Sequence, residues 1–268
     1  MAFLAVPGPF DFALTTERFR AFGVDRATVW HEGGLHRVVG GRELRIVSAP
    51  GGVDAEPLDV ETEPVVRALV GLPFDLEPFY AWAAGDGVLR EIVPALIGFR
   101  PALIPDAFEM LVGAITAQQV SLRSATAIRN RLIERFGTQV GSAWSFPGRE
   151  RIASASEHEL HVTGLTRRKA EYVVGLARSE LDLAALAPLP DDEVKAKLTA
   201  VRGLGEWTAD WFLARHLARP HAWPWGDLAL RKAVEALYRG LDVREARARF
   251  HPFENLTAHY LLLAQRTP

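Results

Sequence analysis

The pattern of apolar residues changes once along this 268-residue chain, near residue 88, and that change limits its possible folds. Before it, short apolar runs are separated by glycine pairs at residues 33–34, 40–41 and 51–52. Short runs between tight turns are typical of a small antiparallel sheet, here over residues 26–60. Helical spacing flanks the sheet, around residues 15–22 and 62–70. We therefore expect residues 1–87 to form a compact α+β domain.

After residue 88 the strand pattern stops and apolar residues recur at helical spacing. Phe108, Leu111, Val112 and Ile115 fall at i, i+3, i+4 and i+7, which places them on one helix face. Similar stripes follow within residues 128–136, 170–177 and 194–201. The fold class that this predicts is mainly α, with a helical core over residues 88–268 behind the sheet domain. We expect two lobes in that core, residues 107–218 and residues 88–106 together with 219–268.

Gly203-Leu204-Gly205 lies between two of the predicted helices. Two glycines around an apolar residue allow a tight turn, and they leave the main-chain N–H groups open to a phosphate. Many ordinary helix–helix turns also contain this pattern. A dinucleotide-binding loop is disfavoured because no strand precedes the turn and Thr208 stands where the third glycine would be. The sequence therefore favours a hairpin that binds nucleic acid.

The charge distribution is compatible with nucleic-acid binding although the formal net charge is −2. Residues 123–178 hold ten lysines and arginines against five acidic residues, a net charge of +5. Such a basic region is also typical of solvated helix faces, so it does not decide the question alone. The chain has no cysteine, which excludes disulfides and iron–sulfur clusters. We expect a cytoplasmic, nucleoid-associated protein with no membrane segment.

Four stretches together resemble the helix-hairpin-helix DNA glycosylases, and among them the 3-methyladenine DNA glycosylase II type. They are residues 106–121, 164–170, 201–210 and 223–232, in the expected order. The resemblance implies a monofunctional enzyme of base excision repair that binds damaged double-stranded DNA as a monomer. Such an enzyme flips an alkylated purine, of the 3-methyladenine and 7-methylguanine class, out of the duplex and hydrolyses its N-glycosidic bond.

Asp227 is the candidate catalytic residue. Its position after Pro224 and Gly226 also fits a plain helix N-cap. The resemblance makes it the carboxylate that stabilises positive charge on the sugar as the base leaves, and that orients the attacking water. The Schiff-base lysine of bifunctional relatives corresponds to Trp207, so the resemblance implies base removal without strand cleavage.

Aromatic rings can stack on a flipped base and attract a cationic one. The expected base pocket consists of Trp207, Trp211 and Trp225, although packing in the core is an alternative for Trp211. The resemblance places DNA contacts at Gln118, Gln119, Gly203, Leu204, Gly205 and Thr208, with Gln119, where some relatives have leucine, as the residue that fills the gap in the duplex. Arg202 departs from the proline usual before the first glycine, and we expect it to contact a phosphate instead. It implies no required cofactor. The one ion expected is a monovalent cation on the main-chain carbonyls of Thr199, Val201 and Leu204, and the histidines suggest no metal site.

Two other functions fit the same motifs. One is a DNA-binding protein that keeps the hairpin but has no catalytic activity. The other is a glycosylase for deaminated or oxidised bases. An intact Trp-Pro-Trp-Gly-Asp loop at residues 223–227 favours an enzyme, because a protein that only binds DNA needs no carboxylate facing it.

Overall fold

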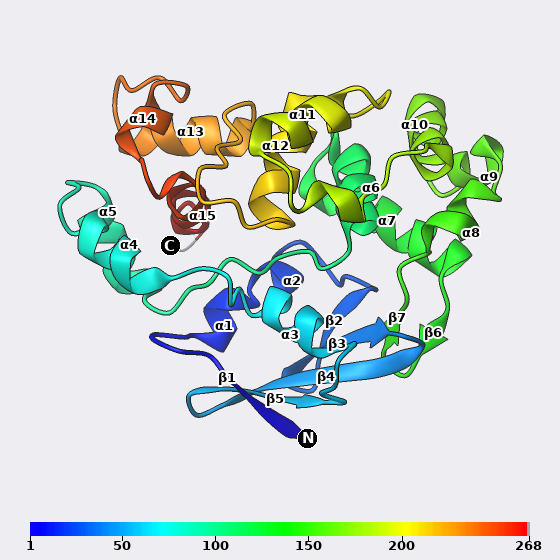
Figure 1. The fold of residues 1–268 in the computed structure, drawn as a ribbon, viewed down its shortest axis with the longest axis horizontal. Helices are drawn as coiled ribbons and strands as arrows, with labels where there is room; N and C mark the ends of the chain where they lie inside the picture. Colours follow the sequence, from blue (N-terminus) through cyan, green and yellow to red (C-terminus); the bar gives the residue numbers. More distant parts are fainter. Residues whose placement is uncertain (267–268) are drawn as a thin grey trace.

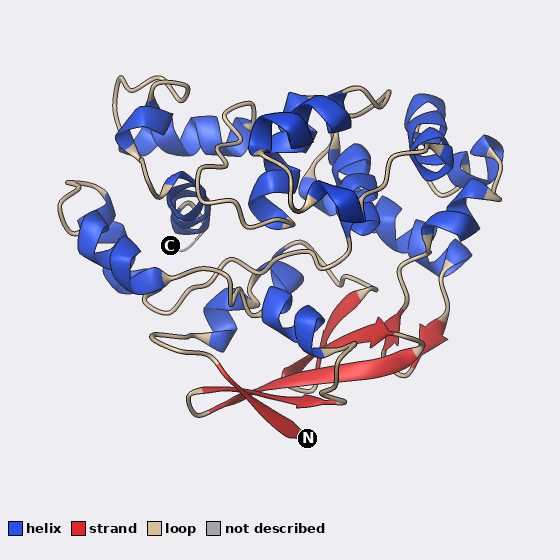
Figure 2. Ribbon diagram, viewed as in Figure 1, coloured by secondary structure: helices blue, strands red, loops and turns tan. Residues whose placement is uncertain are grey.

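A computed structural model describes residues 1–266, with a five-stranded antiparallel sheet at one end of a larger helical body (Figures 1 and 2). The strand order is β1-β5-β4-β3-β2. The strands are β1 (Ala2–Ala5), β2 (Thr28–His31), β3 (Gly34–Val39), β4 (Arg42–Ala49) and β5 (Gly52–Glu56). The N-terminal α+β domain and the mainly α class are thereby confirmed.

The turns of the sheet lie at the glycine pairs, as the sequence predicts. Gly40 and Gly41 join β3 to β4 with φ of 56° and 75°, the left-handed conformation that a two-residue hairpin turn requires. Along β4, Leu44 and Ile46 point to one face and are fully buried. Three short helices cover that face and separate it from the helical body (Figure 1). They are α1 (Phe12–Thr15), α2 (Arg18–Ala21) and α3 (Glu63–Leu69).

Two parts of the β structure were missed by the sequence analysis. Strand β1 pairs with β5 at the sheet edge, and its apolar sequence was not recognised as a strand. The hairpin of β6 (Gln139–Val140) and β7 (Ala143–Trp144) extends from the helical part and packs beside the sheet. The N–H of Trp144 donates to the carbonyl of Arg26 at 2.9 Å. The expectation that strands end at residue 88 was therefore wrong. Two-residue strands carry too little periodicity to be predicted.

The helical body consists of twelve α-helices and two 3₁₀ helices within the described residues, flanking the β6–β7 hairpin. In chain order they are α4 (Leu76–Ala83), α5 (Leu89–Ile92), η1 (Val93–Leu96), α6 (Ala107–Ala117), α7 (Leu122–Phe136), α8 (Arg149–Ala153), α9 (Glu157–His161), α10 (Arg167–Arg178), η2 (Ala184–Leu186), α11 (Asp191–Thr199), α12 (Glu206–Arg215) and α13 (Leu228–Leu237), followed by α14 (Ala246–Arg249) and α15 (Glu254–Ala264). None of the helices in residues 1–266 has the length and apolar character needed to span a membrane.

The chain forms two hydrophobic cores. The change from one to the other comes earlier in the sequence than the expected domain boundary between residues 87 and 88. The smaller core includes sheet residues and extends along the chain to Val70, and it also takes in Ala102. The larger core starts at Phe74 and includes Leu76 and Phe79 of α4. Helix α4 therefore packs with the helical body. Figure 1 shows α4, α5 and α13–α15 on one side of that body and α6–α10 on the other, with α11 and α12 between them.

Candidate active site

Asp227 forms the N-cap of α13, which confirms the local reading of its sequence. Its Oδ1 accepts the main-chain N–H groups of Ala229 and Leu230 at 2.9 and 3.0 Å. Both bonds satisfy helix donors that have no partner within the helix. The cap thus fixes the position of the carboxylate at the end of the loop that carries it.

The second oxygen of Asp227 is held by two indole groups. The Nε1–H of Trp207 and the Nε1–H of Trp211 each donate to Oδ2 at 3.1 Å. Both tryptophans come from α12 and are four residues apart, so they share one helix face. Among the described residues no lysine or arginine forms an ion pair with Asp227. Neutral donors orient this carboxylate, and Arg215, which stacks on Trp211, is near enough to interact with its negative charge without forming an ion pair.

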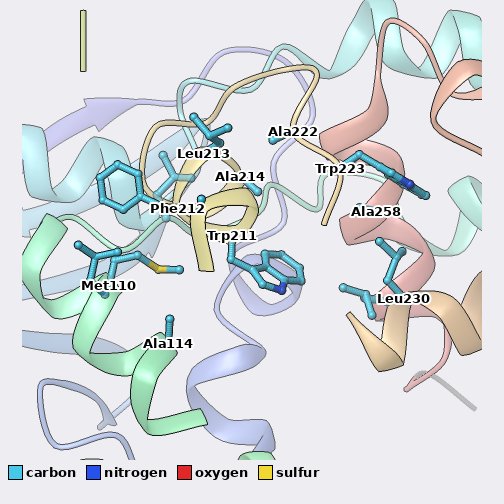
Figure 3. Close-up of a cluster of buried hydrophobic side chains, with 14 of the residues drawn as sticks. Met110, Ala114, Trp211, Phe212, Leu213, Ala214, Ala222, Trp223, Leu230 and Ala258 are labelled. Atoms are coloured by element: carbon cyan, nitrogen blue, oxygen red, sulfur yellow. The ribbon is translucent and has the colours of Figure 1, made fainter. Parts of the chain in front are cut away.

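Trp211 lies in the core behind the carboxylate. It is 4% exposed, and Figure 3 shows it between residues of α6 and α13. The guanidinium of Arg215 lies 4.1 Å from the centre of its ring, and the ring of His259 packs against it edge-on. Trp211 therefore occupies the core, the alternative to the expected base pocket, and one face of its ring is already covered by a cation.

The other two expected pocket tryptophans are half-buried. Arg244 covers the ring of Trp225 at 4.2 Å. Trp207 has no arginine or lysine over its ring in the described part of the chain. Of the three, Trp207 is thus the ring without a cation over it, and its N–H contacts Asp227 as well.

A small cationic cavity beside Trp211 was not foreseen from the sequence. It holds about 30 Å³, room for about one water, between α1–α2 and α15, and its lining includes Arg18, Arg215, His259 and Arg266. Burial lowers the pKa of Arg18 to about 10. Burial and the nearby Arg215 lower the pKa of His259 to about 3, so this imidazole is neutral at pH 7. No sequence signal identifies this cluster, because its members come from opposite ends of the chain.

The Gly203–Gly205 hairpin connects α11 to α12 as predicted, and its two glycines have different surroundings. Gly203 has φ of 95°, and a Cβ there would lie 2.3 Å from the ring of Tyr172. Leu204 is 5% exposed and anchors the turn in the core. A Cβ on Gly205 would meet no protein atom within 4 Å, and no side chain caps the N-terminus of α12 that follows it.

The turn after α6 packs against this hairpin. The Nε2–H of Gln118 donates to the carbonyl of Gly203 at 2.9 Å, whereas Gln119 is exposed with φ of 55°. Lys169 is a residue that the sequence analysis missed. Its buried ammonium donates to the carbonyls of Thr116 and Gln118 at 2.9 and 2.7 Å. This lysine fixes the turn that presents Gln119.

Three further residues of the motif have clear positions. Arg202 is exposed and pairs with Glu171. The side chain of Thr208 is buried, so a contact of this residue with DNA is limited to its main chain. Asp210 is also buried and pairs with Lys195 from α11, and burial raises its pKa. Asp210 is therefore engaged away from the Asp227 site.

Comparisons with known proteins agree with this geometry. A family model described as HhH-GPD superfamily base excision DNA repair protein matches residues 112–253. A DNA-3-methyladenine glycosylase of Bacillus subtilis is 33% identical over 171 residues, which cover 61% of this chain and 56% of that protein. The chain thus spans about half the length of this curated relative.

Solved structures match over nearly the whole chain. A 3-methyladenine DNA glycosylase from Archaeoglobus fulgidus superposes with a TM-score of 0.87 and 30% identity, covering 99% of this chain and 98% of that one. The 8-oxoguanine glycosylase/lyase of Clostridium acetobutylicum, in complex with double-stranded DNA, gives a TM-score of 0.80 at 18% identity, covering 99% and 98%. The second likeness is one of fold alone.

Proposed function

Because this chain belongs to the HhH-GPD superfamily of base excision DNA repair proteins, we propose that it is a DNA glycosylase for alkylated purines. The observation that carries the proposal is the Asp227 carboxylate, which four neutral N–H groups orient next to the half-buried ring of Trp207. The names of the relatives from Bacillus subtilis and Archaeoglobus fulgidus support 3-methyladenine as a substrate.

The chemistry needs a fixed negative charge beside the sugar. As the glycosidic bond lengthens, positive charge builds up on the ring of the sugar, and an anion held nearby stabilises it. Asp227 is held for this task by neutral donors and has no ion-pair partner among the described residues, so its charge is available to the transition state. It also orients the water that attacks the sugar. An N-alkylated purine is already cationic and leaves without a second carboxylic acid.

We propose that base removal proceeds without strand cleavage. At position 207, where the resemblance puts the lysine of bifunctional relatives, a tryptophan donates to Asp227. An indole nitrogen is not basic and forms no Schiff base. Borohydride should therefore trap no covalent complex with DNA, and product strands should stay intact until alkali is added. A trapped adduct would reassign the enzyme to the bifunctional class.

Duplex DNA binds, in this proposal, across the hairpin and the turn after α6. The open N-terminus of α12 and the bare surface at Gly205 suit a phosphate. Exposed Gln119 suits insertion into the duplex, and Arg202 lies exposed beside the hairpin. The chain would act on damaged double-stranded DNA as a monomer.

A monovalent cation would assist at the hairpin. The carbonyl of Thr199 belongs to the last turn of α11, where carbonyl oxygens lack helical partners. The carbonyl of Val201 accepts the N–H of Leu204 at 3.1 Å and keeps a second lone pair. With the carbonyl of Leu204 these groups would ligate such an ion, which would add positive charge near the phosphate. Duplex binding should then be tighter in potassium than in tetramethylammonium chloride of equal ionic strength.

The decisive experiment compares Asp227→Asn with the wild type in single-turnover excision of 3-methyladenine and 7-methylguanine from methylated duplex DNA. We expect excision to fall by on the order of 10²-fold or more, since one transition-state partner is lost, while DNA binding is kept. The matched control is Asp75→Asn, because Asp75 also caps a helix with its carboxylate but lies on α4. Near-normal excision by Asp227→Asn would exclude Asp227 as the catalytic residue. Absence of any released base from the wild type would contradict the enzymatic proposal.

A further inference from the structure

The structure brings together three potential metal ligands that lie far from one another in the sequence. The Nδ1 of His221 is 3.0 Å from Oε2 of Glu254, and the Nδ1 of His251 is 3.3 Å from Oε1 of the same carboxylate. All three ligand atoms lie within 4.8 Å of one another. The sequence analysis found no metal site among the histidines, because His221 and His251 converge only in the fold.

The two imidazoles present the same nitrogen, Nδ1, to the two oxygens of one carboxylate. Their rings stack with centres 4.9 Å apart and an angle of 21° between their planes. Both Nδ1 atoms face Glu254, the first residue of α15. Two histidines and one carboxylate form a ligand set that zinc uses, with a further position left for water. Tetrahedral zinc with bonds of about 2.0–2.2 Å holds its ligands about 3.3–3.6 Å apart. The exposed rings can reach this spacing from the contacts of 3.0 and 3.3 Å that they make with the two oxygens of Glu254.

Burial and exposure also suit a bound ion. The carboxylate of Glu254 is 3% exposed, and among the described residues no lysine or arginine pairs with it. A buried carboxylate is costly unless a cation or strong donors neutralise it. The side chains of His221 and His251 are 42% and 64% exposed, which gives an ion a path from solvent and leaves these rings free to adjust.

We propose that His221, Glu254 and His251 form a site for a divalent transition-metal ion with the coordination preference of zinc. The site would link the loop before α13 to the start of α15. That loop is already tied there, because the N–H of Asn255 donates to the carbonyl of Pro220 at 3.0 Å and its Nδ2–H to the carbonyl of Arg219 at 2.9 Å. His221 precedes Asp227 by six residues in the same loop. A bound ion would therefore stabilise the segment that carries the carboxylate, as a structural clamp and not as part of the reaction.

The test is binding of zinc to the full chain after treatment with a chelator and removal of the chelator. Calorimetric titration with Zn²⁺ and elemental analysis give affinity and stoichiometry, and Co²⁺ absorption reports a tetrahedral nitrogen and oxygen environment. We expect one ion per chain and a rise of the melting temperature on zinc addition. His221→Ala and His251→Ala should each weaken binding at least tenfold and abolish that rise. His158→Ala, which removes an exposed histidine on α9, is the matched control and should bind as the wild type does.

Melting curves of the metal-free variants show whether they fold. His251→Ala changes an exposed side chain but removes a polar partner of the buried Glu254 carboxylate, so its metal-free form should stay folded and melt below the metal-free wild type. Absence of stoichiometric zinc would overturn the proposal, as would equal zinc affinity in the wild type and both histidine variants. Base excision is not a readout, so neither result bears on the proposed glycosylase activity.

Discussion

At the level of single residues, Asp227 uses its two oxygens differently. One oxygen caps α13 and the other accepts two indole N–H groups. The capping role and the catalytic role that the sequence suggested are therefore compatible in one side chain. The cap fixes the position of the carboxylate, and the two indole N–H groups fix the orientation of its plane.

Trp207 has two separable properties, its N–H group and its ring face. Trp207→Phe keeps a ring but removes one of the two donors to Oδ2, a hydrogen bond to a charged group of about 1.5–3 kcal/mol. We expect it to slow excision of cationic 3-methyladenine and neutral hypoxanthine alike, by about tenfold or more. Trp207→Ala should in addition slow excision of the cationic base more than that of the neutral one, because the ring face is lost.

Single-turnover excision from matched duplexes, with folding checked by thermal melting, separates the two effects. Equal losses for both bases in Trp207→Ala would mean that the ring supplies shape only. Unchanged rates in both variants would mean that neither the N–H group nor the ring of Trp207 contributes to excision.

At the level of elements, the hairpin permits a test that the sequence alone would not suggest. Its two glycines look equivalent in the sequence, yet only Gly203 is required by the protein itself. Gly203→Ala places a Cβ against Tyr172 at positive φ and should lower stability as well as DNA binding. Gly205→Ala points its Cβ into open space, so we expect normal stability.

Gly205→Ala should nevertheless weaken binding to damaged and undamaged duplex by similar factors, because its methyl group would lie where a phosphate approaches. Each lost phosphate contact should reduce the slope of log affinity against log salt by about 0.9. Fluorescence anisotropy at several salt concentrations measures both quantities. If Gly205→Ala bound undamaged DNA normally, the hairpin would not be the phosphate contact.

Most of the helices and the hairpin could be predicted because their signals are local. The apolar stripe of α6 lies within eleven residues, and Gly203 to Gly205 specify their own turn. Lys169 could not be assigned from the sequence, because the carbonyls that it binds lie about fifty residues earlier. The same holds for His221 and Glu254, which meet only through tertiary packing. Contacts between distant segments therefore account for the residues that were missed.

At the level of the whole molecule, a buried charge cluster joins the sheet domain to the helical body. Glu109 of α6 pairs with Arg37 of β3, and Arg129 of α7 donates to Glu109 at 2.7 Å. Arg129 also pairs with Asp25, which precedes the sheet strand β2. Arg37, the donor from the sheet, is 7% exposed and Glu109 is 3% exposed. The two parts of the molecule are thus connected through ionised side chains as well as apolar contacts.

The charge of Glu109 makes this connection sensitive to acid. Burial opposes its ionisation, but the charges of Arg37 and Arg129 and their hydrogen bonds outweigh burial and lower the pKa to about 2, from 4.5. A pKa that is lower in the folded state stabilises the fold at pH values above 4.5. That contribution is lost as the pH falls from 4.5 towards 2. We therefore expect the wild type to lose stability steeply over this interval.

Glu109→Gln should remove both the stability and its pH dependence. It leaves the buried guanidinium of Arg37 facing a neutral amide, whereas Arg129 keeps Asp25. Breaking a buried pair in this way costs about 3–5 kcal/mol. The control is Glu134→Gln, because Glu134 of α7 pairs with Arg26 across the same two parts of the molecule but is 39% exposed. Such an exposed pair is worth at most about 1 kcal/mol.

Urea unfolding at pH values between 7 and 3 measures the free energy of unfolding of all three proteins. Glu109→Gln should show a flatter decline below pH 4.5 than the wild type and the control do. A decline as steep as that of the wild type would mean that other carboxylates govern acid unfolding.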